Sequence, residues 1–362
     1  MKHPLKRIVF SLLLSISCFH MQAGEPDTNY VQRFKNLFTV KTFLLNNGFM
    51  YNITPRNNPS FTEKQLDDSK LFYSPHIPTT TGVAINLKGI GFTYIFKFTN
   101  DYLDTTGRIK SGYKQFQMNI YGNKFGLEGY YQDYSRFYFH YKKQNINLKD
   151  YNTNIRAYQF GVNGIFIFNG KKFSYNAAFN QNQFQKKSAG SSMMILALKF
   201  NEIKSTDLIP DSLKPHFSDF SFLQRNRNYA FLVQYGYGYN FVKKNFYFAN
   251  AILLGAGIQN QSYNYPLGKS HKIAFPVIGR AKSSMGYNGK ILFTGIFANI
   301  DMTQSTIKQV QTEQVVYSYG LYLGLRVIEM TKSKGQLKAE KKRMKDAEKA
   351  AKKKAAAKKK NK

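Results

Sequence analysis

Hydrophobic and polar residues alternate along much of the chain with a period of two, which is the period of a β-strand. Segment 314–328 shows the pattern most clearly, because every second residue is large and apolar while most of the residues between are small or polar. Its apolar positions are Val315, Tyr317, Tyr319, Leu321, Leu323, Leu325 and Val327. Similar stripes lie in 90–98, 155–168, 190–201 and 228–241. The pattern predicts strands with one apolar face and one polar face.

The length of the predicted strands favours a membrane protein. Many reach ten residues or more, which is enough to cross a tilted membrane span, whereas the strands of a soluble sandwich average about five or six. A sheet in hydrocarbon must pair every backbone N–H and C=O group, and only closure into a barrel does so. We therefore predict an all-β protein, a transmembrane antiparallel up-and-down β-barrel. A soluble β-protein is the alternative.

The number of strands is less direct to predict. The pattern marks thirteen segments, but bacterial single-chain barrels contain an even number of strands, so at least one segment is wrong. The thirteen are 37–54, 80–88, 90–98, 112–122, 125–140, 155–168, 172–184, 190–201, 228–241, 245–259, 273–287, 290–302 and 314–328. We predict 12 strands, with 14 as the alternative, and 37–54 as the first candidate for removal.

The connections give a second criterion. Short turns are predicted at 122–124, 169–171, 243–245 and 288–290, where Asn, Gly and Lys cluster. Long loops are predicted at 55–79, 99–111, 141–154, 202–227, 260–272 and 303–313. Long loops are usually extracellular and short turns periplasmic. Two short turns in succession between Asn169 and Ser188 break this alternation, so the two halves of the chain cannot both obey it.

The first residues resemble an export signal. A basic start, an apolar core of about 12 residues and a small-residue end at Ala23 predict a signal peptide at 1–23. Cys18 is the only cysteine and lies in this segment, so a mature chain would hold no disulfide. A lipoprotein acylated at Cys18 is the alternative. The expected divisions are then a periplasmic N-terminal segment at 24–36, a barrel at 37–330 and a tail at 331–362.

The tail differs in composition from everything before it. Residues 331–362 are rich in Lys and Ala and contain 15 Lys plus Arg against 3 acidic residues. Such a segment cannot bury a core, and we predict that it is disordered or weakly helical and lies in the periplasm. Its expected partners are peptidoglycan or another polyanion. Nucleic acid is not an expected partner of an exported barrel.

Basic residues on the strands give candidate anion contacts. Four of them lie on faces that we predict to point inward, namely Lys97, Arg156, Lys199 and Arg326. Lys186 and Lys187 stand beside Ser188 and Gly190, where two lysines could hold an anion, although a plain turn with solvated lysines explains the same residues. Outer-membrane lipid and the phosphates of lipopolysaccharide are the expected partners of the barrel surface. The oligomeric state is not predicted.

Several stretches together resemble a known family. They are YNITPRNNP at 51–59, LKGIGF at 87–92, QFQMNIYGNKFGLEGYY at 115–131 and FSYNAAFNQNQFQKKSAGS at 173–191. The chain resembles the uncharacterised outer-membrane barrels of Bacteroidetes that are catalogued only as a domain of unknown function. The resemblance covers about 30–330 and implies a barrel of about 12 strands, but no activity.

Catalytic chemistry has little support in the sequence. An outer-membrane lipase needs a nucleophile beside a positioned base, and the histidines after residue 23 stand alone, with His140 as the best candidate base. No His or Cys cluster indicates a metal site, and no cofactor is expected. We therefore predict a passive small pore or a structural envelope component in the outer membrane. The alternatives are a binding protein that acts through its loops or tail, and a lipid-modifying enzyme.

Overall fold

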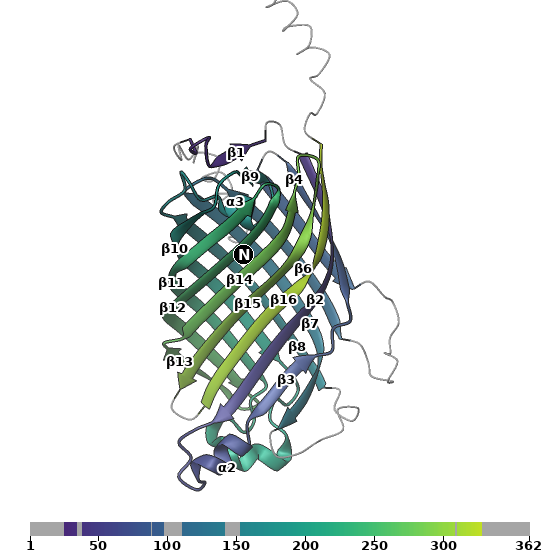
Figure 1. Cartoon of the computed structure of the whole chain (residues 1–362). Helices are drawn as coiled ribbons and strands as arrows, with labels where there is room; N and C mark the ends of the chain where they lie inside the picture. Colours follow the sequence, from purple (N-terminus) through teal and green to yellow (C-terminus); the bar gives the residue numbers. More distant parts are fainter. Residues whose placement is uncertain are drawn as a thin grey trace, which may run out of the picture.

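The computed structural model describes residues 25–34, 38–87, 89–97, 111–141, 153–307 and 310–327. Within them, twelve long antiparallel strands form one closed ring (Figure 1). Each strand pairs with the next one along the chain, and the last pairs with the first, from Val310 opposite Pro55 to Val327 opposite Phe38. The ring has no free edge, as a sheet in hydrocarbon requires. The predicted twelve-strand up-and-down barrel is confirmed.

The strands of the ring are as follows: β2 (Phe38–Pro55), β4 (Thr80–Leu87), β5 (Ile90–Lys97), β6 (Gly112–Tyr121), β7 (Phe125–Tyr141), β8 (Thr153–Ile167), β10 (Ala189–Lys204), β11 (Arg225–Lys243), β12 (Phe246–Tyr265), β14 (Val277–Asn288), β15 (Leu292–Ile307) and β16 (Val310–Val327). Two short strands extend the sheet outside the ring. β3 (Leu71–Pro75) pairs with β2 and β7, and β13 (Gly268–Ala274) pairs with β12.

The segment predicted as a strand at 172–184 is not one, and 37–54 is a genuine strand of the ring. Ser174 accepts a hydrogen bond from the backbone N–H of Ala177 and so caps a short helix, α3 (Tyr175–Phe179). The chain then forms β9 (Gln183–Gln185), which pairs with β1 (Val31–Arg33) outside the ring. Phe173, Tyr175, Ala177 and Phe179 are apolar at every second position, which is the pattern of a strand. Here the apolar residues of α3 are buried inside the barrel instead.

Without that segment as a strand, four short turns lie at one end of the barrel, although the α3 connection at that end is long. One end of the barrel, the turn end, has short turns between β4 and β5, β6 and β7, β11 and β12, and β14 and β15, together with the α3 connection at 168–188. The other end, the loop end, carries α2 (Glu63–Asp68) and the 3₁₀ segment η2 (Asp211–Phe220). The predicted loops at 260–272 and 303–313 are partly wrong, since strands β12 and β15 extend into them to Tyr265 and Ile307.

The outer surface of the barrel is apolar. Forty large hydrophobic side chains are exposed among the described residues, including the predicted outward stripes of β5, β11 and β16. A soluble monomer rarely exposes a contiguous apolar patch of more than a few hundred Å². None of the helices in the described part of the chain is long and apolar enough to cross a membrane.

Apolar side chains also fill the barrel near both of its ends. The turn-end core packs α3 residues such as Tyr175 against inward side chains such as Met193 and Leu232. The loop-end core packs Phe217 and Phe220 of η2 against inward side chains of β2, β3, β7 and β12. Figure 1 shows α3 at the upper end and α2 at the lower end of the barrel. A polar layer lies between the two cores.

Candidate functional site

The polar layer contains a cavity of about 230 Å³, which we call the lumen chamber. Its lining comes mainly from inward positions of the strands, such as Gln115, Gln117 and Asn119, which alternate along β6. Asn180 and Gln181, which directly follow α3, close part of the chamber on the turn side. Successive side chains of a strand point to opposite faces of the sheet. The chamber is therefore lined by the polar, inward-facing residues of the same strands whose outward-facing residues are apolar.

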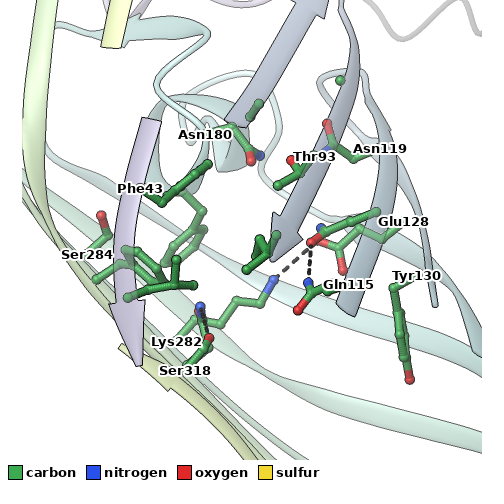
Figure 2. Close-up of a pocket in the computed structure, with 18 of the residues that line it drawn as sticks. Phe43, Thr93, Gln115, Asn119, Glu128, Tyr130, Asn180, Lys282, Ser284 and Ser318 are labelled. Atoms are coloured by element: carbon green, nitrogen blue, oxygen red, sulfur yellow. Dashed lines mark hydrogen bonds and ion pairs between the residues drawn. The ribbon is translucent and has the colours of Figure 1, made fainter. Parts of the chain in front are cut away.

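A carboxylate and a lysine meet in the chamber from strands five places apart in the ring. Lys282 Nζ on β14 lies 3.2 Å from Glu128 Oε1 on β7, and Figure 2 shows the two side chains reaching toward each other. Two tyrosines complete the group, because Tyr121 OH donates to Glu128 Oε1 at 2.5 Å and Lys282 Nζ donates to Tyr175 OH at 2.8 Å. Since Tyr175 belongs to α3, this network attaches the α3 connection to the barrel wall.

A second ion pair lies beside the first. Arg280 Nε donates to Asp301 Oδ1 at 2.6 Å, and the Arg280 side chain is buried. Its Nη1 group has no hydrogen-bond partner among the described residues, which is unusual for a buried donor. Lys199 faces the same chamber, interacts electrostatically with Asp301 and Arg280, and forms no hydrogen bond within the described part of the chain.

The charges around the chamber do not balance. Lys41 donates a hydrogen bond to Gln181 Oε1 at 3.2 Å and has no carboxylate beside it among the described residues. The lining thus contains four cations, Lys41, Lys199, Arg280 and Lys282, against the carboxylates of Glu128 and Asp301. A buried excess of positive charge with unfilled donors suits a small anion.

The six predicted anion contacts lie in different parts of the protein. Lys199 lines the chamber, and Lys97 lies on the inward parity of β5 near the loop end. Lys186 and Lys187 are exposed at the turn end, where Lys186 donates to the carbonyl of Thr28 and Lys187 lies over the Tyr30 ring. They stand in the short connection between β9 and β10.

Arg326 and Arg156 have protein partners. Arg326 is buried at the turn end and donates to the carbonyls of Gln181 and Gly289 and to the side chain of Asn288. The inward placement of Arg156 is wrong, because Arg156 shares the parity of the exposed Phe160 and forms an ion pair with Asp133 on the outer surface. Anion contact by the remaining five residues stays a prediction.

Sequence reasoning missed most of the chamber. The alternation did not single out Glu128, Arg280, Lys282 or Asp301, although each is a charged residue within a long strand, at least three residues from either end. A charge at such a depth marks a functional position in a membrane protein, because it must find a partner or a wet cavity. That signal was present in the sequence.

Evidence for a catalytic centre is not found in the described residues. They hold no group of three or more His, Cys, Asp or Glu side chains that could bind a metal ion. His216 packs against the ring of Phe61, with centroids 4.1 Å apart. The backbone of His140 pairs with Phe72, but its side chain lies outside the described atoms, so its role as a base stays a prediction.

The closed ring, the apolar exterior and the polar lumen define the protein as an outer-membrane-type β-barrel. The sequence matches the family described as domain of unknown function DUF4421 over residues 25–326, and the chain belongs to that family. No curated protein matches it. The predicted resemblance to a family without assigned function is thereby confirmed.

Solved barrels of similar shape are distant. The outer membrane protease OmpT of Escherichia coli is 7% identical, with a TM-score of 0.36 over 81% of this chain and 97% of that one. OmpT, an outer membrane protein of Vibrio cholerae, is 7% identical, with a TM-score of 0.31 over 78% and 97%. The toluene transporter TodX of Pseudomonas putida is 6% identical, with a TM-score of 0.24 over 80% and 89%. Likeness at this level bears on neither activity nor ligand.

Proposed function

We propose that the protein is an integral outer-membrane barrel with its loop end outside the cell and its turn end in the periplasm. The exposed apolar stripes support membrane insertion, and the distribution of long and short connections supports this orientation. β16 ends at the turn end, so residues 331–362, which lie outside the described part, would start on the periplasmic side. Contact of that tail with peptidoglycan is part of the proposal.

We further propose that the lumen passes or holds a small anion. The observation that carries this proposal is the buried Arg280 Nη1 donor without a partner, beside Lys199, in a polar cavity. Leaving a buried charged donor unfilled costs about 1–3 kcal/mol or more, which an anion in the chamber would recover. The cationic excess would also repel cations from the lumen.

The described state is closed. Apolar cores occupy the barrel on both sides of the chamber, so passage through the lumen requires both cores to move. The α3 connection can leave the lumen without breaking the ring, because β8 and β10 stay paired from Ile167 opposite Met193 to Arg156 opposite Lys204. Its polar attachments to the wall, which include those of Tyr175, Gln181, Asn182 and Gln183, are hydrogen bonds that water can replace.

Planar-bilayer recording on the purified full-length chain tests this function. Wild type should give small or rare conductance, and a linker variant in which Gly-Ser linkers replace both residues 173–186 and residues 206–223 should conduct strongly, because both apolar cores then lose the segment that fills the lumen. Under a KCl gradient the reversal potential should show anion preference. Lys199→Gln in the linker variant should weaken that preference, while Lys243→Gln at an exposed turn should leave it unchanged.

A structural role is the second candidate, and the two filled ends of the lumen favour it. If the linker variant folds, as judged by heat-dependent mobility in SDS gels, yet shows no conductance, the pore is rejected in favour of the structural role. If it conducts without anion preference, the chamber charges do not select the solute.

A further inference from the structure

A belt of basic side chains surrounds part of the barrel on its outer surface, just above the apolar stripes on the loop side. We call it the rim cluster. Its cations are Lys114 on β6, Arg156 on β8, Lys204 on β10, Arg225 and Arg227 on β11 and Lys269 on β13. Its carboxylates are Asp133 on β7 and Glu202 on β10. Six cations therefore stand against two carboxylates.

The register places like charges directly opposite one another. Lys204 is opposite Arg156 on one side and opposite Arg225 on the other. Arg225 is in turn opposite Asn264, which is opposite Lys269. Directly opposed like charges destabilise a sheet. The row itself contains no carboxylate among the described residues, and the two carboxylates of the rim cluster leave its six cations in excess.

The two carboxylates, Asp133 and Glu202, are both opposite Tyr158, two residues along β8 from Arg156 and toward the middle of the barrel. They hold the arginine side chains in place. Arg156 donates to Asp133 through Nε at 3.0 Å and Nη2 at 2.7 Å. Arg227 donates to Glu202, and Arg225 Nε lies 3.7 Å from the same carboxylate. Glu202 is only 1% exposed, whereas the Arg156 side chain is 51% exposed.

The carboxylates are therefore covered while the guanidinium groups face out. Each guanidinium has five N–H donors in a rigid fork, so donors remain free for a second anion after the carboxylate is bound. Arginine forks bind phosphate in two-point fashion.

An aromatic row lies directly below the rim cluster. Tyr131, Phe160, Phe200 and Tyr229 are opposite one another on β7, β8, β10 and β11. The rings of Phe200 and Tyr229 are 4.8 Å apart. Along each strand, the aromatic row is four residues from the row of Arg156, Lys204 and Arg225. For a strand tilted by about 40°, this separation corresponds to about 10 Å along the membrane normal. That is the depth relation between a lipid phosphate and the upper part of its acyl chains.

We propose that the rim cluster binds the phosphate groups of a phosphorylated glycolipid in the outer leaflet, with its acyl chains on the aromatic row and the stripes below. The inference rests on the proposed placement in the outer membrane, with the loop end outward. It is independent of the lumen, because the rim side chains have the opposite parity from those of the chamber. The cationic row, the oriented guanidinium groups and the apolar surface below match a ligand with phosphates above hydrocarbon.

The test measures binding of diphosphoryl lipid A to the full-length protein in mixed detergent micelles, by native mass spectrometry. The triple variant Arg156→Gln, Lys204→Gln, Arg225→Gln should lose at least about tenfold in affinity. The control Lys124→Gln, Lys243→Gln, Lys290→Gln removes the same charge from exposed turns and should change affinity by less than about twofold. Dephosphorylated lipid A should bind weakly to both.

Equal affinity of wild type and triple variant for diphosphoryl lipid A would overturn the proposal, as would equal binding of the dephosphorylated lipid. Inorganic phosphate that displaces the lipid at comparable concentration would overturn the lipid assignment in favour of a free phosphate ion. Arg156→Lys with Arg225→Lys keeps the charge, and should retain part of the affinity because only the fork geometry is lost. Failure of the pore proposal would leave this result unaffected, since binding is read without conductance.

Discussion

The Glu128–Lys282 pair offers the sharpest test of the lumen. In Glu128→Ala, Lys282 loses its carboxylate partner while Arg280 remains on the same strand, two residues away. The pair is mostly buried, at 6% exposure for Glu128 and 19% for Lys282. Removing one partner of a buried pair costs about 3–5 kcal/mol, because the other charge stays buried without compensation. We expect the free energy of unfolding to fall by that amount.

The reverse substitution should cost less. In Lys282→Met, Glu128 keeps the hydrogen bond from Tyr121 at 2.5 Å and that from Asn163 at 3.3 Å. What is lost is the ion pair with Glu128 and the hydrogen bond that Lys282 donates to Tyr175. Because Tyr175 OH still bonds to Glu128 at 3.3 Å, no buried polar group is left without a partner, and the expected loss is about 1.5–3 kcal/mol. The double variant Glu128→Ala with Lys282→Met removes both charges, so its loss should be smaller than the sum of the two single losses by about 1–3 kcal/mol.

Urea unfolding of the full-length barrel in phospholipid vesicles measures these values, with far-ultraviolet circular dichroism as the signal. The exposed Lys243→Met is the matched control and should change the free energy of unfolding by less than about 0.5 kcal/mol. Single losses that add to the double loss within about 0.5 kcal/mol would show that the two side chains are not coupled across the lumen. The network described for the chamber would then be incorrect.

Three further predictions concern the outer surface, the loop-end core and the α3 connection. Leu321→Arg on the outer stripe should destabilise the barrel by about 2–4 kcal/mol in vesicles, while Leu267→Arg, at a fully exposed hairpin tip, should have no effect; equal unfolding curves would argue against lipid contact. Phe217→Ala should lower stability by about 3–5 kcal/mol at the loop-end core and speed protease cleavage within 205–224, and unchanged cleavage would show that η2 is held by other contacts. Arg326→Gln should speed amide hydrogen exchange of residues 175–182 by about tenfold, because the hydrogen bonds from Arg326 to the Gln181 carbonyl are lost. Identical exchange in wild type and variant would show that Arg326 does not anchor the α3 connection.

The outer face of the barrel could be predicted from the sequence because it depends only on local alternation. Each strand shows its lipid-facing parity by itself, as the exposed residues of β11 and β16 illustrate. Closure follows from the same property, since a sheet that is apolar outside must pair its edges in lipid. The strand number needed one more condition, an even count, and that condition identified an error without saying where it lay.

The lumen could not be predicted in the same way. Parity shows that Glu128 and Lys282 point inward, but they are 154 residues apart in the chain and five strands apart in the ring. Which inward residues meet depends on strand number and stagger together, which no single segment encodes. The error at 172–184 has a related cause, because α3 is apolar for burial inside the barrel and not for contact with lipid.

Strand β10 carries both proposed sites, one on each parity. Lys199 points into the chamber, and Glu202 and Lys204 lie on the outer surface within the next five residues. A change at Lys199 should therefore alter ion preference and leave lipid binding intact, whereas a change at Lys204 should do the reverse. The separation follows from the pleat alone, because a shift of register by one residue would exchange the two faces. An effect of Lys204→Gln on reversal potential, without loss of folded protein, would mean that the register of β10 is not the one described.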